Sequence, residues 1–357
     1  MIYTRFFGRL IGACALSAGA AIAQPAPAAP AAQANSAASH VIRLDAVVDN
    51  KAGQPVTDLT QSDFTLLDNK APRPMRSFRL MTPAQEPVHV IVLIDTVNTP
   101  FVRVGYVRDE LDSYLKSNDG VLAQPTTYAI LSDQGVQIAS PFTTDGNALR
   151  ASIDHNSTGL REITRDSQWS GDERLQICLT ALDRLIAYAS TLPGRKIVLW
   201  ISPGWPLISG PRVYLTNQQE QQIFSTVVSF STRLRDAGVT LYNINPIGVS
   251  ESLMRADYYQ DFLQGVSRPS DVMPGDLGLQ VLSVQSGGLA IETDSDVAGM
   301  IRKCLADASS WYEITFDPAT GDTPNQYHNI AIKLDQKNLI ARTRDGYYAN
   351  PTFVPQH

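Results

Sequence analysis

The stretch HVIVLIDTVNTPF, residues 89–101, holds the side chains whose types and spacing could do chemistry. Its apolar run ends at Asp95, and Thr96, Asn98 and Thr99 follow with hydroxyl and amide oxygens. Oxygen ligands of this kind are what a hard cation such as Mg²⁺ takes in proteins. A carboxylate at the end of a buried strand can equally accept hydrogen bonds from the backbone N–H groups that follow it. Residue types alone leave open whether Asp95 is a metal ligand or a strand-end group that shapes a loop.

Patterns typical of catalytic sites do not occur in the sequence. The histidines show no metal-binding spacing such as His-x-x-x-His, and Gly-x-Ser-x-Gly, the nucleophile elbow of α/β-hydrolases, is missing. The segments SDQG and SGGL lack the lysine and the glycine spacing of a phosphate-binding loop, so we interpret them as turns. We predict that the protein is not an enzyme, and a hydrolase on an α/β scaffold is the third hypothesis.

The composition indicates a globular chain. Of the 357 residues, 43% are hydrophobic and 18% are charged, which is enough apolar material for a core and enough length for two domains. The formal net charge is −6, and no run of Lys and Arg occurs. Nucleic acid and anionic membrane surfaces need clustered basic residues, so neither is predicted as the main partner.

The start of the chain predicts export. Arg5 and Arg9 precede a small-residue apolar stretch that ends at Ala23 in the small-x-small pattern of a signal-peptidase site. We predict a signal peptide over residues 1–23, followed by a Pro/Ala-rich linker over residues 24–40 and a periplasmic or secreted mature protein. No later segment holds about eighteen uninterrupted apolar residues, so the mature chain is predicted to have no membrane span.

Strand patterns lie at both ends of the chain. Apolar residues alternate in VIRLDAVVD and FTLLDNKAPRP near the start, and in WYEITFD, NIAIKLD and NLIARTRDGYY near the end. The few strands at either end cannot close a core alone. We therefore predict one small β-sandwich-like domain formed by both ends, with the central region inserted into it.

The central region alternates strands and helices. VIVLID, KIVLWIS and VTLYNIN are continuous apolar runs, as expected when helices cover both faces of a parallel sheet. Helical periodicity starts at about Asp172, where Ser170 and Glu173 form a capping-box pattern, and again over residues 217–238. The pattern predicts an open α/β sheet, which binds ligands beyond the carboxyl ends of its strands.

Several of these blocks resemble one known family. LIDTVNTPF, GRKIVLWISPGWP, VQSGGLAIETDSD, WYEITFDPATG and RDGYYA look like successive blocks of the acidobacterial von Willebrand factor A-related family. The resemblance implies a von Willebrand factor A-like, Rossmann-like open sheet inserted into the β-domain. The predicted boundaries are residues 41–87 and 310–350 for the two halves of the β-domain and residues 88–309 for the inserted domain.

The same resemblance bears on Asp95. The parent A-domain holds a metal ion on Asp-x-Ser-x-Ser, a Thr from a later loop and an Asp after the fourth strand. Here Asp95 and Thr99 match two of these ligands, whereas Val97 and Pro203 stand where oxygen ligands are needed. A site with one protein charge binds Mg²⁺ weakly. We expect no cofactor, describe Asp95 and Thr99 as a degenerate metal site, and favour the loop-shaping role.

The predicted function is non-catalytic binding of a protein or a cell-surface ligand through loops at the carboxyl edge of the sheet; a metal-dependent adhesion module is the alternative. Large aromatic residues carry much of the energy of such interfaces. In these loops they are Trp169, Trp205, Tyr214, Tyr258, Tyr259 and Phe262. The opposite interpretation, that the rings pack under their own loops, stays open.

Cys178 and Cys304 would meet an oxidising compartment after export. Both lie on apolar stripes, which is typical of buried free thiols. In the fold that the resemblance implies, their helices lie on opposite faces of the sheet. A disulfide cannot span that separation, so we expect both thiols to be free.

Overall fold

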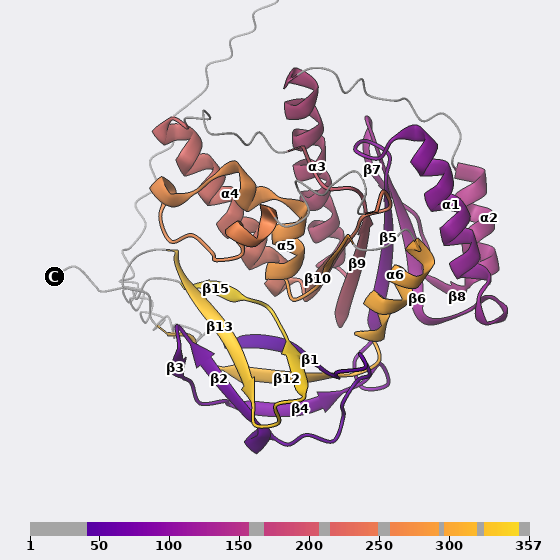
Figure 1. The fold of residues 1–357 in the computed structure, drawn as a ribbon. Coiled ribbons are helices and arrows are strands. Elements are labelled where there is room, and N and C mark those ends of the chain that lie inside the picture. The colour runs from indigo at the N-terminus through magenta and orange to yellow at the C-terminus, as the bar shows by residue number, and fades with distance from the viewer. Residues whose placement is uncertain are drawn as a thin grey trace, which may run out of the picture. The chain divides into compact units, whose positions relative to one another are not determined.

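A computed structural model describes residues 41–156, 168–206, 215–248, 258–292, 296–319 and 325–349. Its central sheet has the strand order β11-β10-β9-β5-β6-β7, with β8 paired to β6 (Figure 1). The parallel strands are β5 (Val88–Asp95), β6 (Val121–Ser132), β9 (Arg195–Ile201), β10 (Val239–Ile244) and β11 (Ala290–Ile291). The antiparallel strands are β7 (Gly135–Ile138) and β8 (Thr143–Asp145).

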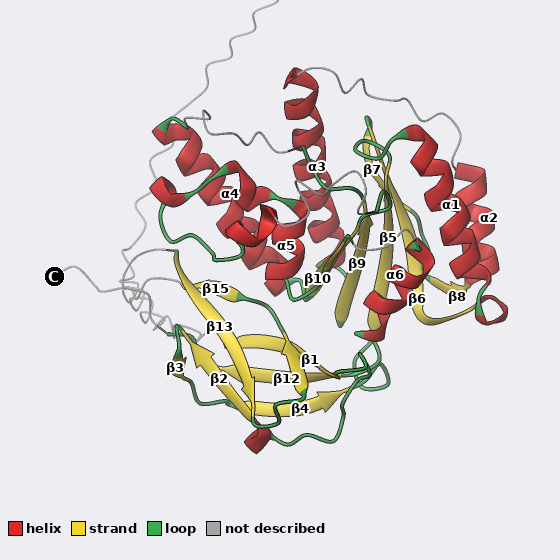
Figure 2. Ribbon diagram, in the orientation of Figure 1, coloured by secondary structure: helices red, strands yellow, loops and turns green. Residues whose placement is uncertain are grey.

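Helices cover both faces of this sheet (Figure 2). One face packs against α1 (Phe101–Lys116), α2 (Gly146–Asn156) and α6 (Val297–Ala306). The other packs against α3 (Gln168–Ala189), α4 (Asn217–Asp236) and α5 (Leu279–Gln285). Successive residues of β5 enter the two cores in alternation, which explains why its sequence is a continuous apolar run. The predicted open α/β sheet with helices on both faces is confirmed.

Strands from both ends of the chain form a β-sandwich of two antiparallel sheets. One has the order β14-β1-β12-β4 and the other β15-β13-β2-β3. The strands from the start are β1 (Ile42–Asn50), β2 (Phe64–Asp68), β3 (Ala71–Pro72) and β4 (Ser77–Met81). The strands from the end are β12 (Trp311–Phe316), β13 (Gln326–Leu334), β14 (Leu339–Arg342) and β15 (Gly346–Ala349). The α/β sheet is thus inserted between two parts of one sandwich, as predicted.

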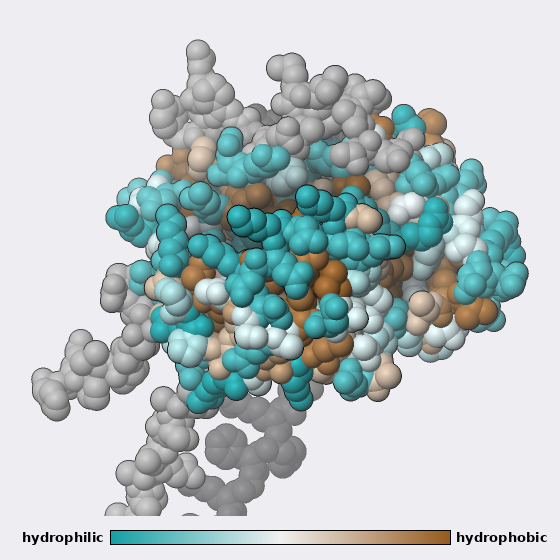
Figure 3. Space-filling view, turned by 60° about the horizontal axis from the view of Figure 1, so that its bottom comes forward, coloured by the Kyte–Doolittle hydropathy of each residue, from teal (hydrophilic) through white to brown (hydrophobic). Residues whose placement is uncertain are grey.

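The sandwich has its own core. Ile42, Leu44, Ala46 and Val48 of β1 are buried in it, together with residues of the second sheet such as Leu66. Their period of two is the pattern that predicted the strand. Hydrophilic and apolar residues are mixed over the described part of the face that Figure 3 brings forward.

Two local expectations differ from the structure. Ser170 lies inside α3, which begins at Gln168, so the predicted helix start is too late. The strand β4 was not predicted at all, and it pairs with β12 along Ser77–Met81. An edge strand with alternating polar residues has too weak a pattern to stand out.

A buried ionic cluster lies where the sandwich meets the α/β sheet. The Asp307 carboxylate accepts hydrogen bonds from Arg342 Nη1 at 2.6 Å and from the Tyr242 hydroxyl at 2.5 Å. Its backbone oxygen accepts one from Arg195 Nη1 at 2.7 Å, and Arg195 lies over the Trp311 ring. The cluster joins β9, β10, β12 and β14 at the residue that follows α6.

The cysteines lie on opposite faces of the sheet. Cys178 of α3 belongs to the core beneath α3, α4 and α5, and Cys304 of α6 belongs to the core beneath α1, α2 and α6. Both are buried free thiols, which agrees with the expected placement. Burial raises the pKa of both thiols. Within the described residues, no helix is long and apolar enough to cross a membrane.

Candidate functional site

Asp95 is the last residue of β5 and is fully buried, with an exposed fraction of 0%. Its Oδ1 accepts hydrogen bonds from the backbone N–H groups of Val97 at 3.0 Å and Asn98 at 2.9 Å. Its Oδ2 accepts from Asn98 Nδ2 at 2.8 Å and from Trp200 Nε1 at 3.1 Å. Four donors thus surround one carboxylate, and each oxygen receives two of them.

This arrangement is the one expected of a carboxylate that shapes a loop. The backbone N–H groups of Val97 and Asn98 bend the chain around Asp95, and buried polar groups are stable when hydrogen-bonded. A cation could bind Asp95 only by displacing donors that already satisfy it. Among the described residues, no group of three or more His, Cys, Asp or Glu side chains is placed to hold a metal ion.

The other positions of the degenerate metal site have different environments. Val97 is 2% exposed and packs in the core with α3, so its apolar side chain has a packing role. Thr99 is also buried, at 2% exposed. Pro203 follows β9 and is half-buried, and it offers no side-chain oxygen. The structure therefore places Asp95 and Thr99 in one buried loop at the carboxyl edge of the sheet.

Trp200 is the site residue that sequence reasoning missed. It lies within β9, the strand beside β5, and its indole N–H reaches the carboxylate of Asp95. Its sequence position inside an apolar run predicts only core packing. The polar atom of a buried tryptophan needs an acceptor, which is the signal that could have linked it to a buried carboxylate such as Asp95.

Trp205 lies in the core and is 5% exposed. Its ring packs edge-on against Trp200, with 5.2 Å between the ring centroids. Such burial fits the interpretation that the ring packs under its own loop, and it does not fit an exposed binding surface. We therefore leave Trp205 out of the proposed interface.

The other predicted aromatic residues are only partly described. Tyr214 and the side chains of Trp169 and Tyr258 lie outside the described residues. Tyr259 and Phe262 are half-buried in the short 3-10 helix Tyr258–Phe262. The Phe262 ring lies over Gly275, where a Cβ atom would be 2.5 Å from it. Phe262 thus packs within its own segment.

Two apolar residues at the same edge were not predicted. Phe101 and Val102 begin α1, directly after the loop that Asp95 organises, and they are 65% and 84% exposed. Phe101 precedes the buried Val104 by three residues, so helical periodicity predicts that it is covered like Val104. Only the structure shows that the sheet no longer covers the first turn of the helix.

The comparisons with known proteins concern the fold. No family model matches the chain, and no curated protein matches its sequence. Among solved structures, it is similar to the SpRpn10 VWA domain with 13% identity and a TM-score of 0.22, over 45% of this chain and 75% of that one.

Two further solved structures are similar to the chain. The manganese-loaded TRAP protein of Plasmodium vivax has 10% identity and a TM-score of 0.32, over 78% of this chain and 98% of that one. A mutant of the PilB minor pilin of Streptococcus sanguinis has 10% identity and a TM-score of 0.29, over 74% and 79%. What this chain binds has to be inferred from its own residues.

Proposed function

We propose that the protein is an exported, non-catalytic binding module of the von Willebrand factor A-related type, which holds a protein or a cell-surface ligand at the carboxyl edge of its sheet. The observation that supports this most directly is the exposed pair Phe101 and Val102 beside the Asp95 loop. These two side chains belong to none of the three cores, and aromatic residues are enriched among those that carry binding energy.

The loop beneath this pair is held in one conformation. The hydrogen bonds from Val97, Asn98 and Trp200 to Asp95 fix the chain up to the start of α1. The backbone N–H of Val104 then donates to Pro100 O at 3.0 Å, which begins the helix. Side chains on a rigid element lose little further entropy on binding, so a preorganised apolar pair is suited to capture a partner.

The alternative is a metal-dependent adhesion module. It is favoured by the position of Asp95 at the end of β5 with Thr99 in the same loop. It is disfavoured because neutral donors already occupy both carboxylate oxygens of Asp95. We therefore propose binding that does not need a divalent cation. The partner makes apolar contacts, and neither nucleic acid nor a hydrolysable substrate is proposed.

Export by an N-terminal signal peptide belongs to the same proposal. Residues 1–23, on which it rests, lie outside the described residues. The charged start and the cleavage pattern at Ala23 support it. Mass analysis of protein recovered from the cell envelope or medium should give a chain that begins at Gln24. A full-length species as the main form would contradict export by cleavage.

The binding surface is tested by capture from the envelope fraction with the mature protein as bait. The double variant Phe101→Ser/Val102→Ser should lose the captured partner by ~10-fold or more, because two interface side chains of this size together carry more than about 1.4 kcal/mol. The matched control is Val121→Ser/Ile340→Ser, since these residues are 60% and 61% exposed and lie elsewhere. Equal capture by both double variants would show that the edge around Phe101 is not the binding surface.

A further inference from the structure

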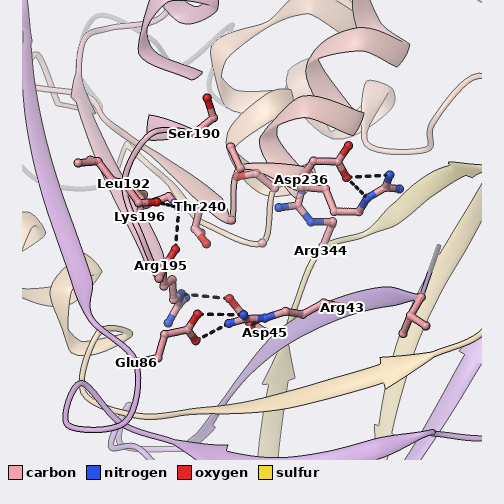
Figure 4. Close-up of a pocket in the computed structure, with 17 residues that line it drawn as sticks. Arg43, Asp45, Glu86, Ser190, Leu192, Arg195, Lys196, Asp236, Thr240 and Arg344 are labelled. Atoms are coloured by element: carbon pink, nitrogen blue, oxygen red, sulfur yellow. Dashed lines mark hydrogen bonds and ion pairs between the residues drawn. The ribbon is translucent and has the colours of Figure 1, made fainter. Parts of the chain in front are cut away.

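A cavity of about 410 Å³ lies at the amino edge of the central sheet, where β9 and β10 begin, and is bounded by β1 of the sandwich (Figure 4). Small-molecule sites have volumes of roughly 300–1,000 Å³. Five basic and three acidic side chains line the cavity, so its lining carries a net charge of +2 in a chain whose net charge is −6. The cavity is on the opposite edge of the sheet from Asp95.

The three carboxylates of the lining are already paired with two of its arginines. Arg43 donates from Nη1 to Glu86 Oε1 at 2.9 Å and from Nε to Asp45 Oδ1 at 3.2 Å. Arg235 donates from Nε to Asp236 Oδ1 at 3.1 Å. The surplus positive charge therefore belongs to the other three basic side chains.

Two of these three have partial compensation. Arg195 lies 3.6 Å from Asp45 Oδ2 in addition to its bond to Asp307 O. Lys196 donates from Nζ to Leu192 O at 3.0 Å and to Gly194 O at 2.7 Å, the carbonyl groups that follow α3. Cations at a helix C-terminus offset its partial negative charge, but Lys196 makes no ion pair with a carboxylate of the described residues.

Arg344 is the cation with the least compensation. It is 9% exposed, and its Nη2 donates to Val239 O at 3.2 Å. No carboxylate of the described residues forms an ion pair with it. Burial, and then the neighbouring Arg235, lower the pKa of Arg344 to about 10. Asp45 and Asp236 attract Arg344 only from beyond ion-pair distance. A buried guanidinium is unfavourable without a direct counter-charge, and an anion in the cavity would supply one.

The chain around Arg344 is fixed before any ligand arrives. Gly287, in the turn after α5, has a φ of +93°, and a Cβ atom there would lie 3.0 Å from the backbone nitrogen of Arg344. The backbone N–H of Asp345 donates to Gln285 O at 3.4 Å. In Figure 4, Thr240 lies between Lys196 and Arg344. The two cations thus line the cavity from different elements on a rigid frame.

We propose that this cavity binds a small ligand through an oxyanion group, a phosphate or a carboxylate. Arg344 is the fork that bonds two oxygens, because a planar guanidinium matches both groups in a bidentate geometry. Lys196 is the second cation, and one N–H of its ammonium group is left to bind the anion. The site is independent of the partner surface at Phe101, since the two occupy opposite edges of the sheet.

The test is isothermal titration of the folded protein with inorganic phosphate, and separately with citrate, at constant ionic strength. The wild type should bind at least one of them saturably with one site. Arg344→Gln and Lys196→Met should each weaken that affinity by about tenfold or more, because each removes a charge-assisted hydrogen bond. Arg302→Gln, an exposed arginine on the other face of the sheet, should leave it unchanged.

The relative response to the two probes distinguishes a phosphate ligand from a carboxylate ligand. Arg344→Gln also removes a buried charge that has no direct ion pair, so without added anion its melting temperature should equal or exceed that of the wild type. Absence of saturable binding of both probes in the millimolar range would overturn the proposal. Binding that neither Arg344→Gln nor Lys196→Met weakens would overturn it as well.

Discussion

Asp95 is central at the scale of single residues because four donors depend on it. Asp95→Asn replaces one acceptor oxygen by an N–H₂ group, which faces the donors of Asn98 and Trp200 or of the backbone. Leaving such buried donors without an acceptor should lower the free energy of unfolding by roughly 2–5 kcal/mol. Urea unfolding measures this directly.

The control for Asp95 is Asp109→Asn, at an exposed position of α1. That change should stay within about 0.5 kcal/mol of the wild type. If Asp95→Asn were as stable as Asp109→Asn, the carboxylate would not organise the loop.

Asp276 should make the stability of the fold depend on pH in a recognisable way. It is 3% exposed in the 3-10 helix Pro274–Leu277, and burial raises its pKa from 3.8 to about 6. A raised carboxyl pKa stabilises the fold below about pH 4, and that contribution is lost as the pH rises through about 6. Asn cannot ionise, so Asp276→Asn should gain stability relative to the wild type between pH 4 and 7, by at most roughly 3 kcal/mol.

A variant with the opposite sign serves as the control for Asp276. Hydrogen bonds from Thr60 hold the pKa of Asp63 below its ordinary value. Asp63→Asn should therefore lose stability relative to the wild type as the pH rises over the acid range. Thermal unfolding at a series of pH values compares the two, and parallel curves for both variants would contradict the assignment.

The sequence predicted that Asp95 has a special role, but it did not predict which side chains surround its carboxylate. A carboxylate that ends an apolar run can be recognised from the sequence, and so can the lack of a side-chain oxygen at Val97 and Pro203. Trp200 follows Asp95 by more than a hundred residues, and only the parallel pairing of β5 with β9 brings the two together. The exposure of Phe101 was missed because the helical spacing from Phe101 to the buried Val104 predicts that Phe101 is buried too. At the edge of the sheet no described strand covers it.

At the scale of elements, Asp307 joins the inserted sheet to the sandwich. Asp307→Ala would leave the buried Tyr242 hydroxyl without its acceptor and the half-buried Arg342 with only Asp49 as a carboxylate partner. Breaking a buried ionic group in this way typically costs about 3–5 kcal/mol of unfolding free energy. The exposed pair of Asp183 and Arg233 is the control, and Asp183→Ala should cost at most about 1 kcal/mol. Similar losses for the two variants in urea unfolding would show that the junction does not depend on Asp307.

Strands were predicted correctly where apolar residues alternate regularly or where the whole strand is apolar. The alternation of β1 and the apolar runs of β5, β9 and β10 were all visible. The strand β6 was not predicted, because Pro125 interrupts its sequence and Thr126 and Thr127 are polar although buried. The pairing of β6 with β8 shifts register between Val121 and Thr126, which is how the sheet accommodates a proline.

At the scale of the whole molecule, the two edges of the central sheet have different chemistry. The carboxyl edge presents Phe101 and Val102 over a loop that Asp95 fixes, and the amino edge holds a cationic cavity beside the sandwich. The strand and helix patterns predicted the insertion and the open sheet, and the resemblance in sequence implied the same arrangement. It could not predict the cavity, because Lys196 and Arg344 come from distant parts of the chain and meet only when the sandwich closes against the sheet.

The central claim is that the carboxyl edge binds its partner without a metal ion. The most direct measurement is the affinity of the wild type for the captured partner in excess EDTA and in millimolar Mg²⁺, with Phe101→Ser/Val102→Ser measured in both conditions. We predict the same affinity for the wild type in EDTA and in Mg²⁺, and a loss of ~10-fold or more for the double variant in each. Binding that requires Mg²⁺ and is unaffected by the double variant would contradict the claim and favour the metal-dependent adhesion module.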